Sequence, residues 1–240
     1  MSVSTGARET AEFAVPARYN GPPGSAQGGY LCGGLAALAE VRPGARAAVT
    51  VLAPVPLDTS MRLRRGPRRS GLWHGEHLVA TVTTATTPIP PVDPVPGEVA
   101  ARSATGFVGG HAHPFPTCFA CGPDRADGLR LAPGPVPGRA DTVACRWQPR
   151  DPAGGPVPAE VVWSALDCPG GWTVDPRANP MLLSWMSAEL ISPVWTNEDY
   201  VVVACRDSAH GRTAVNRTTL YDTAGGLVAT ATTLWTAVHD

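Results

Sequence analysis

An aspartate and a pair of glycines stand in two similar apolar segments of the chain. Asp167 lies near the end of the segment 160–171, whereas Gly28 and Gly29 open the segment 27–37. A buried carboxylate can act as a general base toward water or as a nucleophile toward a carbonyl carbon. A helix start presents unpaired N–H groups, and glycine lets a ligand approach them closely. The two segments together predict one composite site, with the acid from one half and the helix start from the other.

The elements that must position these residues follow each other in the same order twice. In the first half, we expect a strand at 12–19, a helix at 28–41 and strands at 47–52, 60–65, 71–73 and 77–86. In the second half, we expect a strand at 141–148, a helix beginning at 158–167, a helical extension at 181–190 and strands at 200–206, 214–221 and 227–238. Asp222 to Gly226 supplies a hairpin turn between the last two strands. The second half therefore repeats the first: a strand, a helix and a meander.

A proline-rich segment separates the two halves. Residues 87–97 hold five prolines, which neither donate to a sheet nor continue a helix: Pro88, Pro90, Pro91, Pro94 and Pro96. Such a segment is expected to be a surface linker, and glycine and proline stay frequent to about residue 138. The sequence therefore predicts an N-terminal unit at 1–105, a Pro/Gly-rich linker with a Cys-x2-Cys motif at 106–138 and a C-terminal unit at 139–240.

Composition and charge narrow the class of protein. The chain has 240 residues, of which 43% are hydrophobic and 16% charged, which is typical of a soluble globular protein. With 19 basic against 20 acidic residues, a nucleic-acid partner is not expected. All basic residues other than His are Arg, and together with abundant Ala, Gly and Pro this indicates a GC-rich bacterial genome. A local basic cluster that includes Arg62 and Arg64 fits a phosphate-bearing small molecule.

The location of the protein is predicted from what the sequence does not contain. No apolar run approaches the length that a bilayer-spanning helix needs, so no membrane partner is expected. Arg8, Glu9 and Glu12 stand where a signal peptide would have its apolar core, so the protein is expected to be cytoplasmic. The six cysteines are therefore expected to be reduced, and their irregular spacing does not resemble a disulfide framework.

The order of elements resembles the hot-dog fold of the acyl-CoA thioesterase superfamily, in particular the phenylacetyl-CoA thioesterase-like members. The resemblance rests on Thr117-Cys118-Phe119-Ala120-Cys121-Gly122-Pro123, on Gly128-Leu129-Arg130-Leu131 and on Ala165-Leu166-Asp167-Cys168-Pro169-Gly170-Gly171. The first half matches through Gln27-Gly28-Gly29 and Pro56-Leu57-Asp58-Thr59. It implies an α+β protein of the double hot-dog type, in which two curved antiparallel sheets each wrap a central helix.

The resemblance also implies roles for individual residues. In this family, His-Gly-Gly opens the central helix and a catalytic Asp follows in the same helix. Here the first half has Gln27, Gly28 and Gly29 but no acid, and the second half has Asp167 but no Gly pair. Because family members build each site across a twofold interface, these complementary losses leave one whole site. Asn20 stands near a position where the family often has Asn.

We therefore predict a thioesterase that hydrolyses acyl-CoA or acyl-carrier-protein thioesters. Asp167 would activate water while Gly28 and Gly29 hold the oxyanion, and the site would need no cofactor. Substrate-binding residues are expected to be the aromatic Tyr30, Trp163 and Trp172 together with Arg62 and Arg64. Since both halves of the site lie in one chain, a monomer or a homodimer of double hot-dogs could function.

Other hypotheses remain open. The same fold hosts dehydratases, hydratases and cyclases, and decay of catalysis would leave a non-catalytic protein that binds an acyl chain or a pathway intermediate. His111, His113, Cys118 and Cys121 have ligand types that suit zinc, although a tight turn with packed thiols is the simpler interpretation and no metal is assigned. Cys168 could be a nucleophile, but a small core residue is the commoner role.

Overall fold

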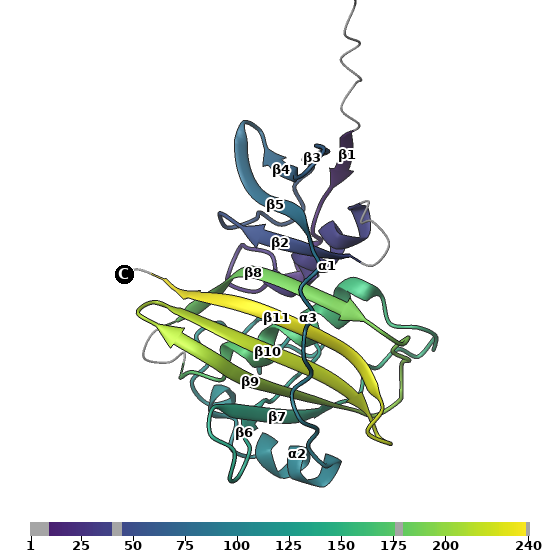
Figure 1. Ribbon diagram of the computed structural model, residues 1–240, viewed down its shortest axis with the longest axis vertical. Helices are drawn as coiled ribbons and strands as arrows, with labels where there is room; N and C mark the ends of the chain where they lie inside the picture. The colour runs from purple at the N-terminus through teal and green to yellow at the C-terminus, as the bar shows by residue number, and fades with distance from the viewer. Residues whose placement is uncertain (1–9, 40–44, 176–179, 239–240) are drawn as a thin grey trace, which may run out of the picture.

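A computed structural model describes residues 10–39, 45–175 and 180–238. Its strands form one 11-stranded antiparallel sheet in the order β1-β3-β4-β5-β2-β8-β11-β10-β9-β7-β6, counted over the described residues. The N-terminal strands make one end of the sheet and the C-terminal strands the other (Figure 1). None of the helices in the described ranges is long and apolar enough to cross a membrane.

The N-terminal half contains a helix and a meander. Its elements are β1 (Thr10–Phe13), a 3-10 turn η1 (Ala17–Tyr19), α1 (Gly28–Leu38), β2 (Arg46–Val51), β3 (Met61–Arg64), β4 (Ser70–His74) and β5 (His77–Ala85). The predicted helix from Gly28 and the four predicted strands after it are confirmed. The strand expected at 12–19 begins earlier and gives way to a 3-10 turn.

The C-terminal half has longer strands and a second helix. Its elements are α2 (Gly97–Ala104), a 3-10 turn η2 (Val108–Gly110), β6 (Gly134–Pro135), β7 (Thr142–Trp147), α3 (Ala159–Gly171), β8 (Met181–Leu190), β9 (Tyr200–His210), β10 (Thr213–Asp222) and β11 (Leu227–Ala237). The predicted turn between β10 and β11 is confirmed. There the Asp222 side chain accepts hydrogen bonds from the N–H groups of Ala224 and Gly226, and Gly225 adopts a φ of 83°.

The two halves share a single sheet, which corrects the prediction of two separate sheets. Strand β2 pairs with β8, and Val49 lies opposite Met186 in this ladder. Both residues are fully buried. Because an unpaired sheet edge leaves its N–H and C=O groups unsatisfied, edge-to-edge pairing of the halves removes one exposed edge from each.

A second correction concerns the segment 181–190, which we expected to be helical. It is strand β8, with β2 on one side and β11 on the other. Its residues include good helix formers such as Leu182, Leu183 and Met186. Strand β11 pairs along nearly the whole of β8 and β2 pairs with Trp185, Met186 and Ser187, and this tertiary pairing outweighs local helix propensity.

The proline-rich segment after β5 packs against the C-terminal strands. The Val92 N–H donates to Thr219 Oγ1, and the Tyr221 hydroxyl donates to the Val92 carbonyl oxygen. Val92 and Val95 are buried beside Val201 and Val203 of β9. The following helix α2, which the sequence analysis did not predict, contacts β7, β6 and β9. The unit boundaries at 105 and 138 stay a prediction.

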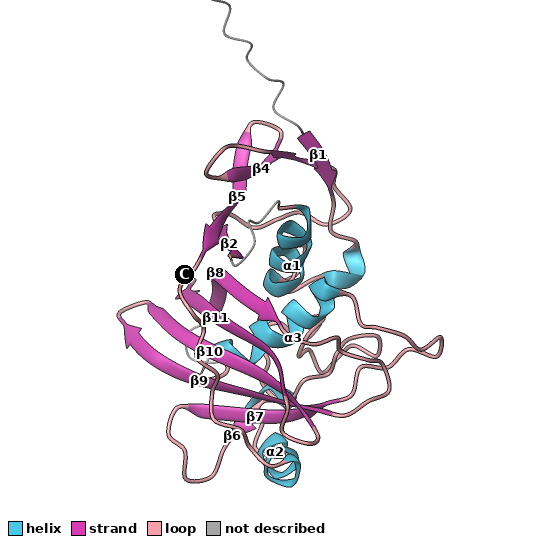
Figure 2. Cartoon of the chain, turned by 45° about the vertical axis from the view of Figure 1, so that its right-hand side comes forward, coloured by secondary structure: helices cyan, strands magenta, loops and turns pink. Residues whose placement is uncertain are grey.

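Helices α1 and α3 lie side by side against the same face of the sheet (Figure 2). Two glycines of α1 make this possible, because a Cβ at Gly29 would lie 2.6 Å from the Asp167 Cβ and one at Gly33 would lie 2.6 Å from the Glu160 Cα. Glycines one turn apart thus let the two helix backbones approach closely, and this approach brings the start of α1 to the middle of α3.

We expect Gly33→Ala to destabilise the protein by about 1–2 kcal/mol, because overpacking against the α3 backbone outweighs the better helix propensity of alanine. Chemical denaturation measures this change. Gly110→Ala is the matched control, since a Cβ there meets no atom within 4 Å. Equal stability of the two variants would show that the close approach of α1 and α3 is not tight in solution.

Candidate functional site

Asp167 lies inside the fold, in the middle of α3, and is 1% exposed. Its Oδ2 accepts a hydrogen bond of 2.8 Å from the Gly29 N–H and one of 2.6 Å from Gln27 Nε2. The carboxylate therefore meets the start of α1, the helix of the other half. The positive end of the α1 dipole and these two donors stabilise a negative charge at this position.

Gln27 prepares the helix start for this contact. It is the N-cap residue of α1, and its Oε1 accepts the Tyr30 N–H at 2.7 Å. Because the oxygen is committed to the cap, the amide nitrogen points its donors at Asp167. Gln27 itself is 3% exposed, so both partners of this hydrogen bond are removed from water.

The second carboxylate oxygen of Asp167, Oδ1, does not take part in the contact with α1. Within the described parts of the chain, Oδ1 is buried and has no hydrogen-bond partner. Burial raises the pKa of Asp167 to about 7, and the hydrogen bonds from Gly29 and Gln27 act in the opposite direction. An unpaired buried carboxylate oxygen is costly for stability, which is the arrangement expected where a water molecule or substrate completes the site.

A cavity of about 510 Å³ adjoins this carboxylate. Both halves line it: Gln27, Gly28, Leu31, Val51 and Val55 from the first, and Asp167, Trp172, Leu183 and Trp235 from the second. A loop between the halves adds His113, Phe115, Cys118 and Cys121. Most of these side chains are apolar and a few are polar, which is the usual composition of a small-molecule site.

The cavity reaches the surface beside Leu52 and Val238, which line it and are 53% and 42% exposed. Arg212 lies at the same place, since its Nη2 donates to the Ala237 carbonyl oxygen at 2.6 Å and its side chain lines the cavity. Burial lowers the pKa of His113, which also lines the cavity, to about 4, so this imidazole is neutral at ordinary pH.

The structure brings together four of the five predicted catalytic residues. Gln27, Gly28, Gly29 and Asp167 meet at one place, where a Cβ on Gly28 would lie 3.3 Å from Asp167 Oδ2. The Gly29 N–H is already engaged by Asp167, whereas the Gly28 N–H is in the first turn and has no acceptor within the helix. Asn20 lies apart from them, and its side chain hydrogen bonds with Thr117 and Arg125.

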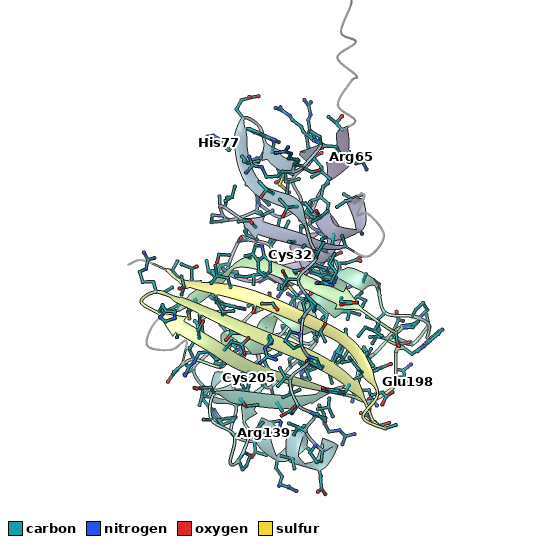
Figure 3. All side chains as sticks on the ribbon, viewed as in Figure 1. Cys32, Arg65, His77, Arg139, Glu198 and Cys205 are labelled. Atoms are coloured by element: carbon teal, nitrogen blue, oxygen red, sulfur yellow. A yellow bond between two sulfur atoms is a disulfide. The ribbon has the colours of Figure 1, made fainter. Side chains whose placement is uncertain are left out.

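The predicted substrate-binding residues are scattered. Trp172 lines the cavity, but Tyr30 stacks on Tyr19 at 3.7 Å between ring centroids and Trp163 packs against Gly33. Neither Tyr30 nor Trp163 lines the cavity. Arg62 and Arg64 belong to β3, and the Arg64 guanidinium lies over the Trp73 ring at 4.9 Å. Figure 3 shows Arg65, the residue that follows β3, at the far end of the molecule from the C-terminal strands.

Sequence reasoning missed the contribution of β8, β11 and the loop around Phe115. Leu183 and Trp235 reach the cavity because β8 packs against both helices and β11 packs against α3. The alternation of buried and half-buried residues at the start of β8 is visible only in the structure, since Met181, Leu182 and Leu183 are all apolar and give no period of two in the sequence. The expectation that all cysteines are reduced is wrong for one pair, because the fold brings Cys121 and Cys168 together and they form a disulfide.

Comparisons with known proteins support the same architecture. No family model and no curated protein matches the sequence. Among solved structures, acyl-CoA thioesterase II TesB2 from Mycobacterium marinum superposes with a TM-score of 0.56 at 15% identity, over 96% of this chain and 93% of that one. A hot-dog fold protein from Alicyclobacillus acidocaldarius gives a TM-score of 0.57 at 16% identity, over 96% and 94% of the two chains.

A third structure shows that the same fold carries other chemistry. The dehydratase domain of RzxB from Pseudomonas fluorescens gives a TM-score of 0.52 at 15% identity, over 88% of this chain and 85% of that one. The chain thus has the hot-dog fold found in TesB-type thioesterases, as the resemblance in sequence predicted. At these identities the likeness shows the fold, and the chemistry must be argued from the site.

The hydrogen bond between Gln27 and Asp167 can be measured by a double-mutant cycle. We expect Gln27→Leu and Asp167→Ala to couple by about 1.5–3 kcal/mol in unfolding free energy, because a buried bond to a carboxylate is among the stronger ones. Gln27→Leu with Glu160→Ala, a carboxylate of the same helix that does not line the cavity, should show no coupling. Additivity of the first pair would mean that the two side chains do not meet in solution.

Proposed function

We propose that this protein hydrolyses acyl thioesters at the composite site between its two halves. The observation that supports this most directly is the position of Asp167: one oxygen is held by the start of α1, and the other is buried beside a largely apolar cavity with no hydrogen-bond partner among the described residues. A carboxylate fixed in this way can accept a proton from a water molecule beside a bound carbonyl carbon.

The reaction follows from these groups. Water attacks the thioester carbonyl carbon while Asp167 Oδ1 takes its proton, which gives a tetrahedral intermediate with a negative oxygen. The Gly28 N–H is the available donor for that oxygen, since Gly29 already donates to Asp167. When the carbon–sulfur bond breaks, the proton passes to the departing thiolate, and a carboxylic acid and a free thiol result. The step uses only the chain and water.

Gln27 favours hydrolysis over dehydration. Dehydration across a carbon–carbon bond needs one group to remove a proton and another to protonate the leaving hydroxyl group. The residue in contact with Asp167 is an amide, which neither gains nor loses a proton under ordinary conditions. His113, which also lines the cavity, hydrogen bonds to Cys121 and to the Phe115 backbone, so its ring is committed elsewhere.

The cavity suggests the kind of substrate. Its apolar lining suits an acyl chain, and its volume of about 510 Å³ is in the range of small-molecule sites. Arg212 at the opening suits the phosphates of a CoA or acyl-carrier-protein carrier. Because one chain holds the whole site, we expect a monomer to be sufficient, and we expect it to act in the cytoplasm of a bacterium.

Asp167→Asn should lower kcat for a hydrolysed acyl-CoA by about 100-fold or more, since the amide cannot accept the proton. Release of free thiol from short, long and aromatic acyl-CoAs measures this. Glu160→Gln is the control, because it changes a carboxylate of the same helix outside the cavity and should keep full activity. Unchanged turnover in Asp167→Asn would contradict the proposed base, and no turnover in the unaltered protein would favour a dehydratase, a cyclase or a non-catalytic binder.

Arg212→Ala should raise KM for acyl-CoA by about 3- to 10-fold through loss of a phosphate contact at the surface. It should leave KM unchanged for the acyl-N-acetylcysteamine thioester, which has no phosphates. Arg62→Ala tests the sequence-based hypothesis in the same assay, since Arg62 lies on β3 away from the cavity. A larger effect of Arg62 than of Arg212 would place the carrier on the N-terminal strands instead.

A further inference from the structure

Three buried cysteines meet in the wall of the cavity. Cys118 and Cys121 come from the loop between the halves, and Cys168 comes from α3, next to Asp167. Their sulfur atoms all lie within 4.8 Å of one another. Cys168 lies 47 positions after Cys121 in the sequence, so the folded structure alone brings it to the other two.

The loop around Cys118 is a tight turn that places the Cys118 sulfur 4.0 Å from the Cys121 sulfur. Gly122 closes the loop, and its N–H donates to the Cys118 carbonyl oxygen at 2.9 Å. A Cβ at Gly122 would lie 2.5 Å from the Cys118 nitrogen, so only glycine fits.

The Cys121 sulfur is surrounded by donors. Trp172 Nε1 lies 3.4 Å from it and His113 Nε2 lies 3.2 Å from it. His113 Nδ1 accepts the Phe115 N–H at 2.9 Å, so in the neutral ring the proton is on Nε2 and points at the sulfur. Hydrogen bonds to ligand sulfurs are the usual surroundings of a metal–thiolate site.

We propose that Cys118, Cys121 and Cys168 bind one zinc ion as thiolates, supported by hydrogen bonds from His113 and Trp172. Three clustered thiolates would repel one another without a cation, and zinc is the common partner of sulfur ligands in tetrahedral sites. Water from the adjoining cavity fills the fourth position. This set differs from the one considered in sequence, because Cys168 takes part and His111 is exposed at the surface.

The disulfide between Cys121 and Cys168 is the oxidised form of the same cluster. A low-molecular-weight thiol reduces it by exchange: two thiol molecules give up two electrons and two protons, leaving two cysteine thiols and one external disulfide. Zinc then binds the three cysteines and releases their three protons. The zinc ion connects the loop that carries Cys118 and Cys121 to α3, next to Asp167. The inference does not depend on the proposed thioester chemistry.

Metal content tests the proposal on the full-length protein. After expression with added zinc and purification under a phosphine reductant, we expect about one zinc ion per chain by mass spectrometry. Cys118→Ser and Cys168→Ser should each lose most of the metal. Cys205→Ser is the matched control, because Cys205 lies on β9 (Figure 3) and is not one of the clustered cysteines, and it should keep the full zinc content.

Cobalt substitution of the unaltered protein tests thiolate ligation of the metal even if a serine variant fails to fold. Intense sulfur-to-cobalt charge-transfer bands in the near ultraviolet would support thiolate ligation. Fully reduced protein, verified by thiol titration, that binds neither zinc nor cobalt would overturn the proposal. So would zinc content that persists in the folded Cys168→Ser variant.

Discussion

The contact between the Asp167 carboxylate and the start of α1 is the interaction on which the rest of this structure depends. A charged group buried at this depth is unfavourable unless donors face it, and here Gly29 and Gln27 provide them from the other half of the chain. Neither half alone could bury its group with a hydrogen-bond partner, because the Asp167 carboxylate lies on α3 and its donors lie at the start of α1. The joint requirement links the folding of the two halves to the assembly of the site.

Close helix packing satisfies this requirement. Gly29 and Gly33 leave no side chain between α1 and α3, so the carboxylate reaches the N-terminal N–H groups directly. The pairing of β2 with β8 also holds α1 and α3 together, since it makes the two halves parts of one sheet. Small residues in the helices and a continuous sheet therefore serve one purpose, which is to hold two distant segments at hydrogen-bond distance.

The loop from His113 to Cys121 forms part of the cavity wall, together with residues of the two halves. It has little regular structure, and contacts between Cys121 and α3 hold it in place. Cys118 and Cys121, which the sequence analysis assigned to a linker, therefore belong to the wall of the cavity.

The sequence by itself determined the two helices, most of the strands and the complementary acid and glycine pair, because helix starts, hairpin turns and alternating burial are local patterns. It also gave the resemblance to the hot-dog fold. It did not determine that segment 181–190 is a strand, that the two sheets are one, or that Cys168 meets Cys118 and Cys121. Nor did it show that Gly29 would be engaged by Asp167 while Arg62 and Arg64 lie far from the cavity. Only the tertiary structure decided these points, because each depends on which distant segments share a sheet edge or a helix face, and local propensity carries no such information.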